Sequence, residues 1–167
     1  EIGDRRGEGN SFGKLGIAFK SLGQYDKAIK NYEQALKRLH EIGDRSGEGT
    51  CHGKFGSSFH SLGQYDEAVN HLGRALMILR EIGDRRGEGN SFGKLGIAFK
   101  SLGQYDKAIK NYEQALKRLH EIGDRSGEGT CHGKFGSSFH SLGQYDEAVN
   151  HLGRALMILR EIGDRRG

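Results

Sequence analysis

The chain contains 167 residues, of which 34% are hydrophobic and 29% are charged, and its net charge is +4. The longest run of apolar residues covers only residues 75–79, which excludes a transmembrane helix because such a helix needs about 20 apolar residues. The chain shows no signal peptide and begins at Glu1 without Met, so we expect an excerpt of a longer protein or a processed form.

The sequence repeats at two nested periods. Residues 1–80 and 81–160 are identical letter for letter, and each half contains two similar 40-residue segments. A fixed period of about 20–50 residues is typical of a solenoid, in which each unit buries one face against its neighbours. We therefore predict a single solenoid domain, residues 1–167, of four repeats at about 1–40, 41–80, 81–120 and 121–160. A partial fifth-repeat tail follows at 161–167.

The first repeat has the pattern of two amphipathic helices. Asp4 is placed to cap a helix at about residues 5–21, in which apolar residues recur at helical spacing until Gly23 ends it. A second helix follows at about residues 25–41, where Gln24 is a poor N-cap; Gly43 ends this helix and Asp44 caps the next. The same plan predicts helices at about 45–61, 65–81, 85–101, 105–121, 125–141 and 145–161.

Small residues indicate where the two helices of a repeat meet. Gly16 and Ala28 carry no bulk, so we expect close approach there, whereas Gly13 is expected to face outward. The helical spacing of Phe12, Phe19, Tyr25 and Tyr32 predicts that these aromatic side chains pack in the core.

The buried positions of the first repeat resemble the tetratricopeptide pattern. The matching residues are Phe12, Leu15, Gly16, Phe19, Ala28, Tyr32, Ala35 and Leu36. Three features depart from the pattern: His52 replaces the first aromatic residue in the second repeat, the closing proline is absent, and the period exceeds the usual length of about 34. HEAT and armadillo repeats share the longer period but lack the Leu-Gly and Gly-x-Tyr spacing.

The linking segment Glu-Ile-Gly-Asp-Arg-x-Gly-Glu-Gly is similar to that of tetratricopeptide repeats in the Partner-of-Inscuteable family. The resemblance implies an all-α, right-handed solenoid of antiparallel helix pairs. It also implies a protein-interaction scaffold whose concave groove binds elongated, partly acidic peptides.

No catalytic or metal-binding pattern emerges from the sequence. The adjacent pair Cys51 and His52 points in directions about 100° apart on a helix, so the histidine cannot serve the cysteine as a base. Zinc ligands at the usual spacing are absent, and we predict no catalytic residue, metal or cofactor. Cys51 and Cys131 lie two repeats apart, beyond the reach of a disulfide, so we expect free thiols in a reducing compartment and a cytoplasmic location.

In tetratricopeptide arrays the first helix of each repeat lines the concave side. The positions between its buried residues are therefore our candidate peptide-binding residues. They are Asn10, Lys14, Ile17, Lys20, Thr50, Lys54, Ser57 and His60, with their copies Asn90, Lys94, Ile97, Lys100, Thr130, Lys134, Ser137 and His140. One lysine per repeat forms a row, namely Lys14, Lys54, Lys94 and Lys134.

Two interpretations of this lysine row stay open. It is either the solvated face of amphipathic helices or a surface that attracts an acidic, extended peptide. A carboxylate clamp fits only in its lysine, since Ile17 and Ser57 stand where an asparagine would help. Nucleic-acid binding is disfavoured because the aromatic residues that would stack on bases are assigned to the core.

We therefore predict a non-enzymatic interaction scaffold that binds an extended acidic peptide. The alternative is a structural or engineered repeat module without a dedicated ligand. In either case we expect head-to-tail self-association, because the last full helix carries an apolar stripe that no later repeat in the chain can cover. Its residues are Ala148, Val149, Leu152, Ala155, Leu156 and Leu159.

Overall fold

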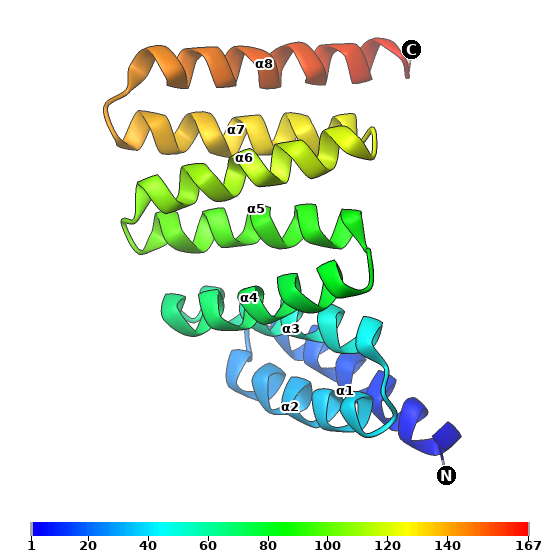
Figure 1. The fold of residues 1–167 in the computed structure, drawn as a ribbon. Coiled ribbons are helices and arrows are strands. Elements are labelled where there is room, and N and C mark those ends of the chain that lie inside the picture. Colours follow the sequence, from blue (N-terminus) through cyan, green and yellow to red (C-terminus); the bar gives the residue numbers. More distant parts are fainter. Residues whose placement is uncertain (1, 167) are drawn as a thin grey trace. The chain divides into compact units, whose positions relative to one another are not determined.

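The computed structural model describes residues 2–166, and these form eight α-helices and no strand (Figure 1). This confirms the predicted all-helical repeat fold. The helices are α1 (Ile2–Ser21), α2 (Tyr25–Glu41), α3 (Arg45–Ser61), α4 (Tyr65–Glu81), α5 (Arg85–Ser101), α6 (Tyr105–Glu121), α7 (Arg125–Ser141) and α8 (Tyr145–Asp164).

Six of these helices begin and end at the residues that the sequence predicted, and the two terminal helices are longer. Helix α1 begins at Ile2, so the prediction of Asp4 as its N-cap is wrong: Asp4 lies inside the first turn. Helix α8 continues to Asp164, three residues beyond its copy α4. In α4 the chain turns at Gly83, which has a φ of 74°, whereas α8 continues through Gly163 in helical conformation.

The turns between helices follow the predicted chemistry. Gly23 and Gly43 have φ values of 72° and 69°, a left-handed conformation that glycine adopts without steric cost. At the start of α3 the backbone N–H of Gly47 donates to the Asp44 carboxylate over 2.9 Å, so Asp44 is a true N-cap. Gln24, before α2, makes no side-chain cap hydrogen bond. The predictions that Asp44 caps α3 and that Gln24 is a poor cap for α2 are therefore confirmed.

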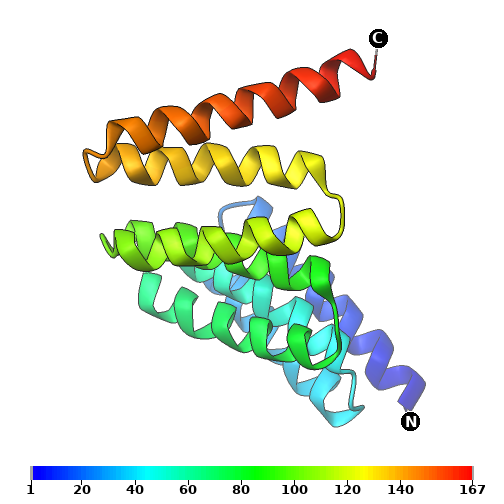
Figure 2. The same ribbon diagram turned by 45° about the horizontal axis from the view of Figure 1, so that its top comes forward.

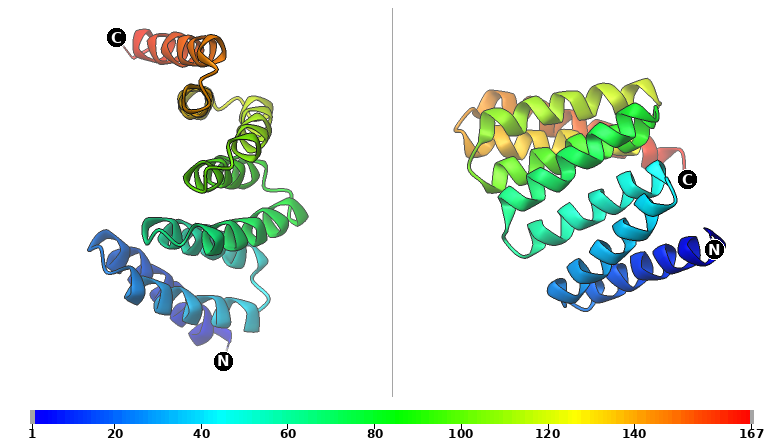
Figure 3. Two further views of the ribbon diagram at one scale, coloured as in Figure 1. Left: turned by 90° about the vertical axis from the view of Figure 1, so that its left-hand side faces the viewer. Right: turned by 60° about the horizontal axis from the view of Figure 1, so that its bottom comes forward.

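The chain divides into two compact units, Glu1–Asp84 and Arg85–Gly167. In the first unit α1 pairs with α2 and α3 with α4, each as an antiparallel hairpin, while α2 packs against α3 (Figure 3). The second unit repeats this arrangement with α5 to α8, and its hairpin of α7 and α8 is visible in Figure 2. Helices α1 and α3 also approach each other, as do α5 and α7.

Tyr32 lies at the centre of the core in the first unit, as its position predicted. It is buried together with residues of α2 and α3, and its ring lies 6.0 Å from that of Phe55. Phe12 and Phe19 of α1 pack against this cluster and are partly buried. Gly16 makes the contact possible, because a Cβ atom there would lie 2.5 Å from the Tyr32 ring.

Charged side chains link the helix ends in each unit. Glu88, at the start of α5, is only 1% exposed and accepts from Arg118 Nε of α6 over 3.0 Å. Arg85 lies 3.4 Å from the same carboxylate. In the first unit Arg38 of α2 pairs with Glu8 of α1 in the equivalent place, at 2.6 Å. Pairing of this kind is what permits a carboxylate to be buried.

Identical sequences differ in burial according to their place in the chain. Leu15 of α1 is 46% exposed, whereas its copy Leu95 in α5 is 5% exposed. Leu152 of α8 is 45% exposed, whereas its copy Leu72 in α4 is 1% exposed. The first and last helices therefore each present exposed apolar side chains.

A candidate peptide-binding pocket in each unit

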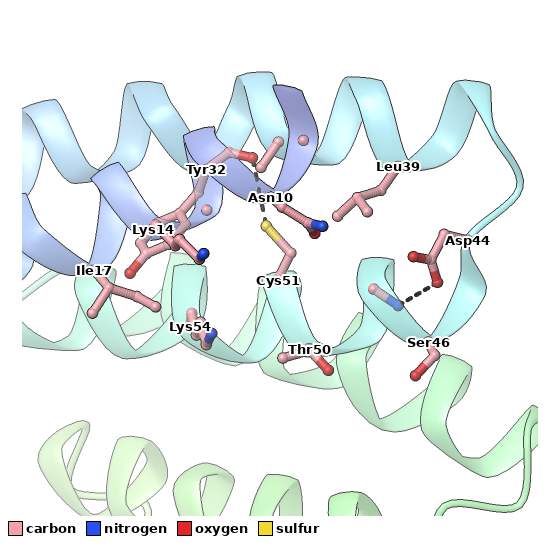
Figure 4. Close-up of a pocket in the computed structure, with 14 residues that line it drawn as sticks. Asn10, Lys14, Ile17, Tyr32, Leu39, Asp44, Ser46, Thr50, Cys51 and Lys54 are labelled. Atoms are coloured by element: carbon pink, nitrogen blue, oxygen red, sulfur yellow. Dashed lines mark hydrogen bonds between the residues drawn. The ribbon is translucent and has the colours of Figure 1, made fainter. Parts of the chain in front are cut away.

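The first unit contains a pocket of about 420 Å³ between α1 and α3, with α2 forming its floor (Figure 4). Helix α1 contributes Asn10, Lys14 and Ile17, and α3 contributes Thr50 and Lys54. These five residues were all predicted from the sequence as candidate peptide-binding residues. The structure brings them together around one hollow.

The pocket has charges of opposite sign at its two ends. Figure 4 shows Lys14 and Lys54 toward one end and Asp44 toward the other. The Asp44 carboxylate already accepts the cap hydrogen bond of α3, so part of its hydrogen-bonding capacity is used. The two ammonium groups carry three donors each, and they give their end of the pocket a positive potential.

The pocket is open because a side chain is missing from its wall. A Cβ atom at Gly13 would meet no atom within 4 Å, so the space in front of it is free. At Gly47, by contrast, a Cβ atom would lie 2.7 Å from the Leu39 side chain. One glycine therefore leaves the hollow open, while the other lets α3 approach α2 closely at its edge.

The floor of the pocket includes buried residues that were not among the predicted binding residues. Cys51 donates from its Sγ to the Tyr32 carbonyl over 3.6 Å, and both residues line the pocket. Burial raises the pKa of the Cys51 thiol to about 12, so the thiol is neutral and a poor nucleophile near pH 7. Burial also raises the pKa of Tyr32, and the nearby Ser58 hydroxyl offsets part of that rise. The distance and angle between the two hydroxyls do not meet the criteria for a hydrogen bond. Neither group therefore offers charge to a ligand.

The second unit contains the same pocket, with a volume of about 380 Å³. Asn90, Lys94, Thr130 and Lys134 line it, and each is the copy of a lining residue in the first unit. A second hollow of about 480 Å³ lies beside it and is lined by Ile97, Lys100, Lys134 and Ser137 among others. Lys100 donates from Nζ to Ser137 Oγ over 2.6 Å across α5 and α7.

The remaining predicted residues lie outside these pockets. Burial lowers the pKa of His60, and the nearby charge of Lys20 lowers it further. The rings of His60 and Tyr65 lie 5.1 Å apart, and those of His140 and Tyr145 lie 5.4 Å apart. Ser57 donates to the Gly53 carbonyl within its own helix over 3.0 Å. These residues stay candidates for contacts beyond the pocket.

A histidine pair in each unit was not foreseen as a pair. His52 of α3 and His71 of α4 approach through their Nδ1 atoms at 3.1 Å, and His132 and His151 do so at 2.9 Å. The only hint in the sequence was that His52 takes the place of Phe12. Among residues 2–166 no group of three or more His, Cys, Asp or Glu side chains is arranged to hold a metal ion.

Comparison with known families gives a match along nearly the whole chain. A family model described as tetratricopeptide repeat matches residues 7–81, 52–121 and 88–161, which overlap in the way that tandem repeats do. No curated protein matches the chain in sequence. Within residues 2–166, no helix is both long and apolar enough to cross a membrane.

Several solved structures share the fold. Aspartyl phosphate phosphatase F from Bacillus subtilis is 20% identical, with a TM-score of 0.89 over 96% of this chain and 42% of its own. A signal transduction ATPase with a tetratricopeptide repeat sensor, from Pyrococcus horikoshii, is 21% identical, with a TM-score of 0.87 over 97% of this chain and 25% of its own. The tetratricopeptide domain of Arabidopsis FLU is 25% identical, with a TM-score of 0.67 over 70% of this chain and 98% of its own. The chain thus spans less than half of the first two proteins.

Proposed function

Because the chain belongs to the tetratricopeptide-repeat family, whose members generally mediate protein–protein interactions, we propose that it is a non-enzymatic scaffold that binds an extended acidic peptide. Within each unit, a peptide segment would lie along the face where the two first helices of its repeats approach each other, α1 and α3 in one unit and α5 and α7 in the other. The observation that carries this proposal is the pocket in which Lys14 and Lys54 lie at one end above an apolar floor.

The chemistry of the pocket favours a peptide with acidic side chains. Its floor of Ala35, Leu39 and Cys51 suits the aliphatic part of a side chain, while the lysines suit a carboxylate. Asn10 and Thr50 carry side-chain donors and acceptors that suit a peptide backbone. These are the elements of a small-ligand site, in which a mostly apolar hollow contains a few placed polar groups.

The test replaces the four lysines Lys14, Lys54, Lys94 and Lys134 with glutamate. We expect this variant to lose binding to an acidic peptide library while its helical circular dichroism stays unchanged. A matched control makes the same change of charge at four exposed lysines of α2 and α6, namely Lys30, Lys37, Lys110 and Lys117. Binding of the unmodified chain should weaken as salt rises, since charges are screened over about 8–10 Å. Equal binding by the test and control variants would refute the proposal.

A second candidate function is head-to-tail association of the chain with copies of itself. It is supported by the exposed apolar face of α8, which includes Val149, Leu152, Leu156 and Leu159, and by the exposed Leu15 of α1. In the sequence, the one other copy of the α8 segment, residues 65–81, is followed by the copy of the α1 segment, residues 85–101. A second copy that placed its α1 against α8 would cover both faces at once. Such a contact does not close on itself unless the rotation permits, so it would propagate.

Sedimentation velocity over a wide range of concentrations tests this association. We expect the average mass to rise with concentration, and we expect Leu152→Glu with Leu156→Glu to keep the chain monomeric. The control pair Gln34→Glu and Gln114→Glu adds the same charge at exposed residues of α2 and α6 and should leave association intact. A chain that stays monomeric at all concentrations would exclude this function and leave peptide binding untouched.

The same proposal includes a cytoplasmic location. Cys51 and Cys131 are both free and buried, which suits a reducing compartment. A thiol titration of the chain isolated from its source under non-reducing conditions should find two thiols after unfolding. A mixed disulfide at either position would contradict the location.

A further inference from the structure

We infer that the chain carries two separate and equivalent binding sites, one in each unit, and that each accepts one acidic side chain between two lysines. The inference rests on the proposed peptide-binding function and specifies its stoichiometry. It predicts two ligand segments per chain, with equal intrinsic affinity.

The first support is that the two pockets are built from corresponding residues, with the single exception that Ile17 lines the first pocket while its copy Ile97 lines the neighbouring hollow. Residues 1–80 and 81–160 are identical, and the pockets of about 420 and 380 Å³ have copied walls. Asn10, Lys14, Thr50 and Lys54 correspond to Asn90, Lys94, Thr130 and Lys134. Sites with the same side chains in the same places should bind the same ligand equally well.

The second support is that each pocket is complete within its own compact unit. All residues that line the first pocket fall between Gly9 and Lys54, inside the unit Glu1–Asp84. Those of the second fall between Gly89 and Lys134, inside the unit Arg85–Gly167. Each site can therefore bind without any contribution from the other unit.

The third support is that a glycine, which has no side chain, leaves each site open. Neither Gly13 nor Gly93 would bring a Cβ atom within 4 Å of another group, and each lines its pocket. A long side chain at either position would occupy the hollow without displacing the core. Each site can therefore be closed separately, which makes the proposal open to a direct test.

The experiment measures binding of a short, capped peptide of alternating glutamate and alanine by isothermal titration calorimetry. We expect two peptides per chain for the unmodified protein. Gly13→Met and Gly93→Met should each leave one peptide per chain with unchanged affinity, and the double variant should bind none. As matched controls, Gly73→Met and Gly153→Met add the same side chain in open space on α4 and α8, outside the pockets, and should still bind two.

Other outcomes would overturn the inference in distinguishable ways. One peptide per chain, lost entirely in both single variants, would mean a single site, and the proposed function would stand. Two peptides per chain in the Gly13→Met/Gly93→Met variant would mean that the ligand binds outside the pockets. No binding by the unmodified chain would refute the proposed function together with this inference.

Lys54→Ala is a second way to weaken only the first site, and its effect should match that of Gly13→Met in direction.

Discussion

At the residue scale, glycine has two opposite effects within a single helix. In α1 a Cβ atom at Gly16 would lie 2.5 Å from the Tyr32 ring, whereas one at Gly13 would meet nothing within 4 Å. We expect Gly16→Leu to destabilise the fold by at least about 1 kcal/mol through overpacking. We expect Gly13→Ala to stabilise it by up to about 1 kcal/mol, because alanine is the better helix former.

Denaturant unfolding of both variants measures this difference. The copies Gly96 and Gly93 provide an internal control, since a Cβ atom at Gly96 would also lie 2.5 Å from a tyrosine ring, that of Tyr112. The opposite ranking of the two variants would mean that α1 is rotated about its axis relative to this structure.

The histidine pair is the second feature at this scale. The ring centroids of His52 and His71 lie 5.3 Å apart while their Nδ1 atoms lie 3.1 Å apart, so the two nitrogens point at each other. One nitrogen must donate and the other must accept, which allows at most one proton between them. The His71 ring also lies 4.1 Å from that of Phe55, in surroundings that disfavour charge. The pair is therefore held in a state with at least one neutral imidazole.

This arrangement predicts a loss of stability in mild acid. Burial, aided by the charge of His71 and of Arg74 and Arg45, lowers the pKa of His52 from 6.5 to about 4. The pKa of His71 is also lowered by burial and Arg74, against a smaller opposing effect of Glu67. Between pH 6.5 and about pH 4 the unfolded chain binds more protons than the folded chain does. The stability that the neutral histidines contribute is therefore complete above about pH 6.5 and is lost as the pH falls toward 4. We expect a loss on the order of 1 kcal/mol per pair.

Urea unfolding at a series of pH values checks this expectation. The chain itself offers the control, because odd-numbered repeats carry Phe12 and Asn31 where the second repeat carries His52 and His71. The variant with His52→Phe and His71→Asn, made in both units, should show a flatter profile between pH 6.5 and 5. An unchanged slope would mean that the pairs do not control stability in this range.

At the scale of the element, the helices of this chain begin in two different ways. Helix α3 has a side-chain cap from Asp44, whereas α2 begins after Gln24 without one. We expect Asp44→Ala to cost about 1 kcal/mol of unfolding free energy and Gln24→Ala to cost almost nothing. Thermal unfolding of the two variants measures the difference, and Asp44→Asn should recover most of the loss. Equal losses at both positions would show that the hydrogen bond to Gly47 contributes little.

The elements also show how far the sequence determines the structure. The internal helix bounds were predictable because Gly23, Gly43 and Asp44 are local signals that act within one turn of chain. The pocket walls were predictable because the repeat pattern fixes which face of α1 and α3 is outward. The contribution of α2 to the pocket floor was not, because buried residues such as Tyr32 are assigned to packing by pattern alone.

Pairings between helices escaped prediction for a related reason. The contact of His52 with His71, and that of Arg118 with Glu88, depend on the relative rotation and shift of two helices. A hydrophobic stripe specifies which face is buried, but not which polar side chains meet at its edge. The extension of α8 was unpredictable too, since the same sequence at the end of α4 stops three residues earlier.

At the scale of the whole molecule, identical sequences should differ in their protection from exchange. The segment 92–102 repeats 12–22 letter for letter, yet Leu95 is 5% exposed and Leu15 is 46% exposed. Protease fragments of these two segments have the same sequence and therefore the same mass. We expect hydrogen exchange to give two isotopic envelopes for these fragments, with the faster one from α1, because local opening is easiest where few apolar contacts form.

The second helix of each unit supplies the control for this experiment. Tyr32 and Tyr112 are each 1% exposed, so fragments of α2 and α6 should give one envelope. A single envelope for the 12–22 segment would mean that α1 is as well protected as α5. Labelling only one half of the chain with heavy isotopes would assign each envelope to its unit.

The letter-for-letter identity of the two halves also bears on the kinetics of folding. Helix α2 offers the same surface to α1 and to α5, so contact energy cannot tell the right partner from the wrong one. The correct partner is joined to α2 by residues 22–24, whereas α5 is joined to it by residues 42–84. Loop-closure entropy then favours the correct hairpin by only roughly 2 kcal/mol. Refolding at high concentration, where a helix from another molecule also competes, should therefore pass through mispaired species that must come apart before native hairpins form.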